Sequence, residues 1–265
     1  IIRFILGFFV MIGALMFLGC PIRMILRLGG GDLNALFGIA GFAGGIGFGT
    51  IFLKKGYSLQ RTYALSKLES AMMPAIQVGL LVLVVTAPAF IFFSQKGPGA
   101  MHAPWLISLA AGLVVGGLSQ VSRLCTVGGF RDLFLFKKSI LIFGYLAVLV
   151  GVFVVNISFG NFHLGFENQP IAHTDGLWNF LGMALAGFCS VLLGGCPLRQ
   201  LIMTGEGNSD SAVTVLGLAA GAAFAHNFGL AASGAGPTLN GEIAVVVGFI
   251  VALIIAVVNT KRVNA

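Results

Sequence analysis

Apolar segments of membrane-spanning length fill most of this chain. We expect eight of them to form transmembrane helices: 1–19, 33–53, 70–93, 104–121, 139–158, 177–194, 212–232 and 241–259. A helix needs about 20 predominantly apolar residues to cross the hydrocarbon core of a bilayer. Only 9% of the residues are charged, whereas a soluble domain carries about 25%. The sequence therefore predicts an all-α polytopic membrane protein with a single transmembrane domain over residues 1–265.

The basic residues are concentrated in loops on one side of the predicted spans. They follow the second span, precede the fifth and follow the last: Lys54, Lys55, Arg61, Lys67, Lys137, Lys138, Lys261 and Arg262. The loops at 159–176 and 232–241 contain no Lys or Arg. Placing the basic loops in the cytoplasm lets all eight spans alternate, with Lys96 as the exception. Both ends of this chain are then cytoplasmic, and the net charge of +7 gives no indication of nucleic-acid binding.

One motif, Gly-Cys-Pro-Ile/Leu-Arg, occurs at residues 19–23 and again at 195–199, 176 positions later (196 − 20). Each copy follows an apolar span and leads into a polar, glycine-rich loop. Because the two preceding spans are five spans apart, the copies are predicted to be inverted in the bilayer. Inverted repeats with helices broken near the midplane are common in transporters. We expect such repeats at 1–94 and 104–260, with Cys-bearing broken or re-entrant loops that meet near the midplane.

A third segment, 119–132, also brings a cysteine, a Gly-Gly pair and two arginines together after a glycine-rich span. At the repeat offset its counterpart would fall before residue 1 (125 − 176 = −51). We therefore expect the first repeat to be incomplete at its N-terminal side, with about two more spans upstream of Ile1. That upstream part is expected to carry a counterpart of Cys125.

The cysteines beside the predicted breaks are candidates for a solute pathway. Non-helical backbone is tolerated in a bilayer only inside protein or beside a wet cavity, so Pro21 and Pro197 point to pathway-lining turns. The thiols of Cys20, Cys125 and Cys196 are polarizable, weak donors and acceptors, which suits a soft sulfur- or selenium-containing anion. The alternatives are ordinary surface loops and small buried hydrophobes.

A mid-span cysteine, Cys189, is interpreted as such a buried hydrophobe. Zinc is not favoured for any of the four cysteines, because they show neither C-x-x-C spacing nor a histidine partner in sequence.

Arginines flank the three cysteines of the breaks. Arg23, Arg123 and Arg199 are predicted to draw an anion in, together with Arg27 and Arg131, because a guanidinium matches oxyanions with a planar fork of donors. The alternative is that they anchor the topology as positive-inside residues. Four acidic residues are expected to pair with these arginines: Asp32, Asp132, Glu206 and Asp210.

No enzyme signature is present in the sequence. It contains no Walker loop, G-x-S-x-G, dinucleotide fingerprint or H-E-x-x-H, so we predict no enzyme activity and no cofactor. His226 and Asn227 lie in the seventh predicted span, where polar groups tend to face the bundle interior. We interpret them as structural residues rather than pathway residues.

The chain resembles the YeeE/YedE family of bacterial sulfur-transport membrane proteins. The matching motifs are Gly19-Cys20-Pro21, Arg123-Leu124-Cys125 and Gly195-Cys196-Pro197, each at the end of a glycine-rich span. The extended strings at 19–28, 31–35 and 195–202 look most like the YedE branch associated with selenium metabolism. The family usually has a further Cys-bearing segment upstream, which this chain does not show.

The resemblance implies a bacterial inner-membrane protein in which thiosulfate or a related anion passes between Cys20, Cys125 and Cys196. We therefore expect a transporter or channel for a small inorganic sulfur or selenium anion, with membrane lipid around it and no nucleic-acid partner. The second hypothesis is a membrane carrier or scaffold that hands the chalcogen covalently to a cytosolic sulfur- or selenium-handling protein.

Overall fold

The computed structural model describes residues 1–59, 67–87 and 103–260, together with residues 90, 92, 95 and 100. Within them, eight long helices correspond to the eight predicted spans: α1 (Ile2–Phe17), α3 (Asn34–Lys54), α4 (Lys67–Thr86), α5 (Trp105–Val121), α7 (Ile140–Ser158), α8 (Gly176–Leu193), α10 (Ser209–Asn227) and α11 (Leu239–Val258). Three short helices each follow a predicted break: α2 (Pro21–Gly29), α6 (Thr126–Phe136) and α9 (Pro197–Gly205). The all-α prediction is confirmed.

Six helical segments in the described part of the chain are long and apolar enough to cross a membrane. Three of them join a long helix to the short helix after it, at 2–29, 105–136 and 176–205, and the other three are α3, α7 and α11. These spans confirm a polytopic membrane protein. The other two predicted spans, α4 and α10, form helices, but as described they are not both long and apolar enough to count among these six segments. Arg61, Lys96, Lys261 and Arg262 lie outside the described residues.

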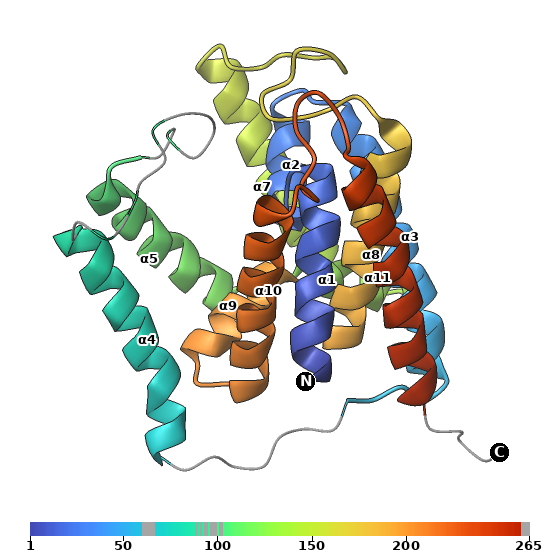
Figure 1. Ribbon diagram of the computed structural model, residues 1–265. Helices are drawn as coiled ribbons and strands as arrows, with labels where there is room; N and C mark the ends of the chain where they lie inside the picture. Colours follow the sequence, from blue (N-terminus) through green and yellow to red (C-terminus); the bar gives the residue numbers. More distant parts are fainter. Residues whose placement is uncertain are drawn as a thin grey trace.

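The core of the bundle is made by α1, α3, α8, α10 and α11 (Figure 1). The two most extensive helix pairs are α3 with α8 and α1 with α10, and α1 also packs against α8. The helix α11 contacts α1 and α8. By contrast, α4 and α5 lie to one side and make their main contacts with α9.

Glycines set the spacing between α3 and α8. A β-carbon on Gly41 would overlap the carbonyl oxygen of Phe180, and one on Gly45 would overlap that of Ala184. The two helices therefore run in parallel with their backbones in direct contact. Small residues four apart allow this approach, which is how helices associate where lipid weakens the hydrophobic drive.

The same contacts recur between α10 and α1 at the repeat offset. Gly217 meets the carbonyl oxygen of Phe4, and Gly221 meets that of Phe8. Each glycine and each partner lies 176 positions from its counterpart in the α3–α8 pair (217 − 41 and 180 − 4). The contact of α10 with α1 is therefore equivalent to the contact of α3 with α8, with α10 in the place of α3 and α1 in the place of α8. The helices α1 and α8 run in opposite directions (Figure 1).

These contacts support an inverted repeat that relates α1–α3 to α8–α10. The correspondence does not extend to α4, because α11 packs on the core whereas α4 lies apart from it. The division into repeats at 1–94 and 104–260 stays a prediction.

Candidate functional site

The three cysteine-bearing breaks share one local geometry. Each long helix ends near a left-handed residue, the next N–H donates to a carbonyl five residues back, and the cysteine follows two positions after the left-handed residue. This hydrogen bond belongs to the Schellman motif, which terminates helices. The left-handed residues are Leu18 (φ 63°), Arg123 (φ 52°) and Gly194 (φ 86°). The predicted breaks are thus present in all three segments.

Each of the three cysteines is the N-cap of a short helix. Cys20 precedes α2, Cys125 precedes α6 and Cys196 precedes α9. Pro21 and Pro197 occupy the first helical position, where the missing N–H and the fixed φ of proline suit a helix start. Gly128 N donates to the Sγ of Cys125 over 3.3 Å, and the backbone N–H of Arg199 interacts with the thiol of Cys196. Helix N-termini carry partial positive charge.

The structure brings these three cysteines together around Tyr145 of α7. The side chains of Cys125 and Cys196 interact directly and are buried, while Cys20 is half-buried. The Tyr145 hydroxyl donates to the carbonyl oxygen of Pro21 over 3.0 Å and lies within electrostatic reach of Cys20 and Cys196. We call these four residues the thiol cluster.

The role of Tyr145 was missed in the sequence. The sequence feature that could have indicated it is the tyrosine hydroxyl in an otherwise strongly apolar span, because polar groups in such spans face the protein interior.

The fourth cysteine lies elsewhere. Cys189 is fully buried in the part of the core that also holds Leu6, Leu185 and Val245. It faces apolar side chains rather than the thiol cluster. Among the described residues, no group of three His, Cys, Asp or Glu side chains is arranged to hold a metal ion.

The predicted arginines occupy different settings. Arg199 is half-buried; its Nη1 donates to Gln120 Oε1 over 2.9 Å, and its Nη2 lies 3.6 Å from Glu206 Oε1. Arg123 has an exposed side chain. Arg23 and Arg27 lie one turn apart on α2.

Three of the four expected acidic partners are paired as predicted. Asp32 bonds Arg27, Asp132 bonds Arg131 and Glu206 lies beside Arg199. The expectation for Asp210 is wrong, because it pairs with Arg3 over 2.9 Å. The cause is the parallel packing of α1 and α10, which brings the N-terminal ends of both helices together.

The interior placement expected for His226 and Asn227 is also wrong. Both are exposed in the last turn of α10, where Asn227 Nδ2 donates back to the carbonyl oxygen of Ala223.

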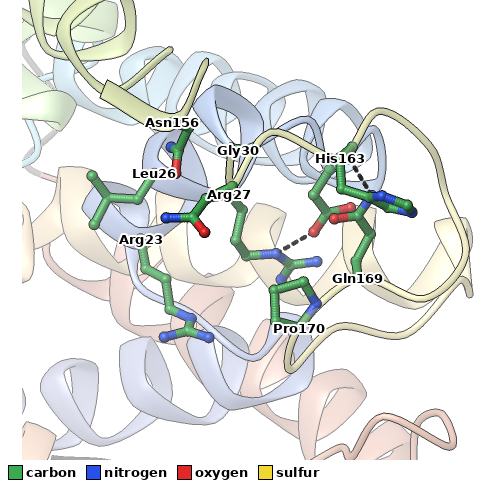
Figure 2. Close-up of a pocket in the computed structure, with 10 residues that line it drawn as sticks. Arg23, Leu26, Arg27, Gly30, Asn156, His163, Gln169 and Pro170 are labelled. Atoms are coloured by element: carbon green, nitrogen blue, oxygen red, sulfur yellow. Dashed lines mark hydrogen bonds and ion pairs between the residues drawn. The ribbon is translucent and has the colours of Figure 1, made fainter. Parts of the chain in front are cut away.

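A pocket of about 460 Å³ opens beside α2 (Figure 2). Arg23 and Arg27 line it from α2, Asp32 from the turn before α3, and Asn156 from α7. The loop between α7 and α8 contributes His163 and Gln169. The pocket is therefore mainly polar and extends along α2 from Arg23, in the first turn, to Gly30, just after its last residue.

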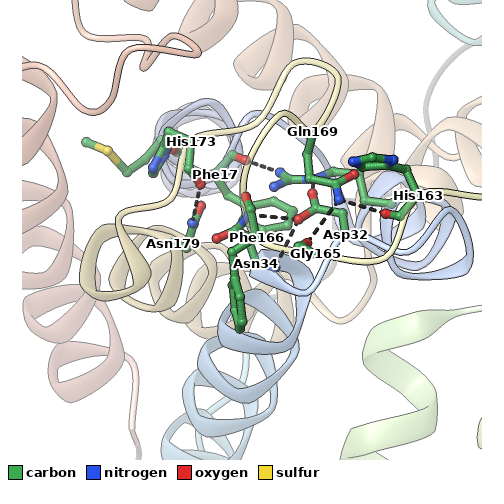
Figure 3. A network of polar contacts seen from close by, with 11 residues as sticks. Phe17, Asp32, Asn34, His163, Gly165, Phe166, Gln169, His173 and Asn179 are labelled. Carbon is green, nitrogen blue, oxygen red and sulfur yellow. Dashed lines mark hydrogen bonds and ion pairs between the residues drawn. The ribbon is translucent and has the colours of Figure 1, made fainter.

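A polar network fixes the wall of this pocket (Figure 3). Arg27 Nε donates to Asp32 Oδ2 over 2.6 Å, Arg27 Nη1 donates to the carbonyl oxygen of Phe17 over 2.5 Å, and the guanidinium lies 4.0 Å from the centre of the Phe17 ring. Asn34 Nδ2 donates to Asp32 Oδ1 and to the carbonyl oxygen of Phe166. The α7–α8 loop is thereby fastened to the turn between α2 and α3.

A comparison with protein-family models finds one match, to a family described as sulphur transport, over residues 121–263. This match covers more than half of the chain. The chain belongs to the sulphur transport family. The resemblance noted in the sequence is confirmed at family level, and the selenium-associated branch stays a prediction. Family membership indicates a transporter rather than an enzyme. Cys125, Tyr145 and Cys196 lie within the matched residues, and Cys20 lies before them. A comparison with curated proteins gave no match.

Proposed function

We propose that this member of the sulphur transport family moves a small sulfur- or selenium-containing anion of the thiosulfate type along Cys20, Cys125 and Cys196. The observation that carries the proposal is the meeting of three thiols from three separate helix breaks around Tyr145. Broken helices are tolerated in a membrane only where protein or water satisfies their backbone. Three helix breaks at one place therefore favour a solute pathway over a purely structural role for the breaks.

The helix starts supply the attraction for an anion. The N-termini of α2, α6 and α9 all begin at the thiol cluster, and each offers partial positive charge and backbone N–H donors. None of the four cluster residues is an arginine or lysine. Conduction requires binding that is favourable yet weak enough for release, and dipoles with thiol donors satisfy both conditions.

We place the cluster between the two inverted halves, near the midplane of a bacterial inner membrane. The support is the exchange of α1 with α8 and α3 with α10, which sets the two Cys-Pro breaks in opposed orientations. Both described ends, at α1 and α11, lie at the same end of the bundle (Figure 1). The proposal puts that end in the cytoplasm, where the basic loops favour it.

The test is uptake of labelled thiosulfate, and separately of selenite, into liposomes that contain the full chain. We expect Cys20→Ala, Cys125→Ala and Cys196→Ala each to lower the flux by about tenfold or more, the size expected for losing one hydrogen bond to a charged group. Cys189→Ala is the matched control and is expected to retain flux. Wild-type flux in all three pathway variants, at equal reconstitution, would reject the thiol path.

The direct contact between Cys125 and Cys196 also suits the second hypothesis, a covalent carrier. The thiolate of one cysteine would take the outer sulfur of thiosulfate as a persulfide and release sulfite, and the held sulfur would lie within reach of the other cysteine. Intact mass of the protein after incubation with thiosulfate separates the two functions. An added sulfur atom on Cys125 or Cys196, lost on reduction, supports the carrier, and flux without any adduct supports the channel or transporter.

A further inference from the structure

We propose that the pocket beside α2 is a binding site for a small inorganic oxyanion, held by Arg23 and Arg27 before it reaches the thiols. The ligand class is an anion with at least two terminal oxygens, such as thiosulfate, sulfate or selenite. The binding site stands on its own geometry, while its place ahead of the thiols rests on the transport function proposed above.

The Nη2 nitrogen of Arg27 is the group that would donate to a bound anion. The side chain is buried, with 7% of its surface exposed. Its Nε and Nη1 are occupied by Asp32 and the Phe17 carbonyl, which fixes the plane of the guanidinium. Among the described residues its buried Nη2 has no partner. Buried polar groups in proteins are nearly always hydrogen-bonded, and this nitrogen belongs to a residue that lines the pocket.

Arg23 supplies the second cation. It lies four positions earlier on α2, so both side chains project from the same face of the helix. Its buried Nε also has no partner within the described part of the chain. Two arginines line the pocket with one carboxylate, that of Asp32, and the two guanidinium groups repel each other. An oxyanion relieves this repulsion, because its oxygens accept from both guanidinium groups at once.

The described part of the second half does not repeat this pair of arginines. At the offset of 176, the counterpart of Arg23 is Arg199, and that of Arg27 is Met203. Arg199 is already bonded to Gln120 and lies beside Glu206. The positive charge is thus available beside α2 and offset beside α9. An otherwise two-fold arrangement therefore has one end that captures an anion and one end that does not hold it.

The position of the pocket identifies the capturing end. It lies against the α7–α8 loop, which contains no Lys or Arg, whereas the N-terminal end of α1 and the C-terminal end of α11 are at the opposite end of the bundle (Figure 1). On the topology proposed above this is the outer side of the membrane. The pocket at that side then raises the local concentration of anions near the start of the path.

The test is equilibrium binding of labelled thiosulfate to the purified full chain, with unlabelled sulfate, selenite and chloride as competitors. We expect Arg23→Gln to weaken binding by about tenfold or more, as for loss of a hydrogen bond to a charged group. Arg23→Lys keeps the charge without the planar fork of donors, and its affinity for thiosulfate is expected to lie between those of wild type and Arg23→Gln. Sulfate and selenite are expected to compete well, and chloride poorly.

Arg23 is the primary variant because Arg27 also holds the turn before α3 and its removal threatens folding. Lys54→Gln removes the same charge from an exposed residue at the other end of the bundle and is expected to bind as wild type. Wild-type affinity in Arg23→Gln overturns the site. An equal loss in Lys54→Gln also overturns it, because the binding would then follow net charge alone.

A cysteine variant separates this proposal from the transport function. Cys196→Ala is expected to lose flux and keep thiosulfate binding, because Cys196 is not among the residues that line the pocket. Loss of binding in Cys196→Ala would overturn the pocket as the binding place. If Arg23→Gln weakens binding but the wild-type protein shows no flux, the binding site is supported and the transport function is rejected.

Discussion

At the residue scale, the choice of cysteine at three helix starts is informative. Ser, Thr, Asp and Asn are the residues that stabilise helix N-termini best, and none stands at these positions. Among the described residues, Cys20 and Cys196 make no capping hydrogen bond of ordinary geometry, although the backbone N–H of Arg199 interacts with the Cys196 thiol. Sulfur is a weak acceptor, so the N-cap side chains hold the first N–H groups of α2 and α9 only weakly. This leaves them available to an anion, at a cost in helix stability.

A conservative substitution tests this trade between stability and flux. We expect Cys196→Ser to keep or raise the free energy of unfolding, by up to about 1 kcal/mol, because a serine hydroxyl caps the helix. The same change is expected to lower thiosulfate flux, because a serine hydroxyl accepts from these N–H groups more strongly than a thiol does. Thermal unfolding and liposome uptake measure the two effects. Unchanged flux together with higher stability would show that these N–H groups play no part in conduction.

A second residue-scale prediction concerns His173 in the α7–α8 loop. Its Nε2–H donates to the carbonyl oxygen of Met16 over 2.8 Å, and burial lowers the pKa of the ring despite that bond and the nearby Asp175 and Asp32. The unfolded chain therefore binds a proton below about pH 6.5 that the folded protein does not. Stability is expected to fall as the pH drops below that value.

The measurement is the melting temperature at about pH 7.5 and about pH 5.5, on either side of the ordinary histidine pKa. His173→Gln is expected to show a smaller drop than wild type, and His226→Gln, at an exposed position, the same drop as wild type. An identical drop in all three proteins would mean that His173 does not control the acid sensitivity.

At the scale of helices, backbone contact through glycine determines the arrangement. The α3–α8 and α1–α10 pairs use glycines at matching positions against matching carbonyl oxygens. Such contacts fix the relative height of the two helices, because a side chain at either glycine would push them apart. The three short helices attach to the ends of these fixed pairs, so the glycines indirectly position the cysteines.

Paired substitutions test this arrangement. Gly45→Ala and Gly221→Ala are each expected to destabilise the protein by about 1–3 kcal/mol, since they overpack equivalent contacts. Gly112→Ala is the control, because a β-carbon there meets no atom of the described residues within 4 Å. Chemical unfolding of the purified protein gives the three values. A large loss for one variant and none for its counterpart would contradict the equivalence of the two helix pairs.

Sequence patterns predicted the helices and their breaks because both are local properties. Span length, the Cys-Pro dipeptides and the glycine-rich loops each indicate structure within about 20 residues. Contacts between helices gave a weaker signal. The partner of Asp210, the exposure of His226 and the role of Tyr145 depend on which helices lie side by side. The Arg27–Phe17–Asp32 network likewise required the positions of α1 and the α2–α3 turn, which periodicity does not supply.

At the scale of the whole molecule, α1 and α8 run in opposite directions, and the arginines of α2 and α9 differ in their partners. The α7–α8 loop and the start of α1 lie at opposite ends of the bundle (Figure 1). The arginine pocket lies at the first of these ends. The helix pairs α3–α8 and α1–α10 are thus packed in an equivalent way, while the arginine pocket lies at one end of the bundle.

Reporter fusions test the proposed orientation in the membrane, with the pocket end outside and the ends of α1 and α11 in the cytoplasm. Alkaline phosphatase fused after Asn161, in the α7–α8 loop, is expected to be active, because the enzyme folds only outside the cytoplasm. A fusion after Thr260, beyond α11, is expected to be inactive, and a green fluorescent protein at the same place is expected to fluoresce. Phosphatase activity at both sites would contradict the proposed placement of the two ends.

The glycine contacts between α3 and α8 and between α1 and α10 also limit how such a protein moves. Helices whose backbones touch at two successive turns cannot slide or tilt against each other without losing both contacts. Because α1 also packs on α8, these four helices form one rigid frame, and alternating access by rocking one half against the other is disfavoured. We expect any gate to be small: a rotamer change at Tyr145 or a shift of one short helix, within a frame that stays still.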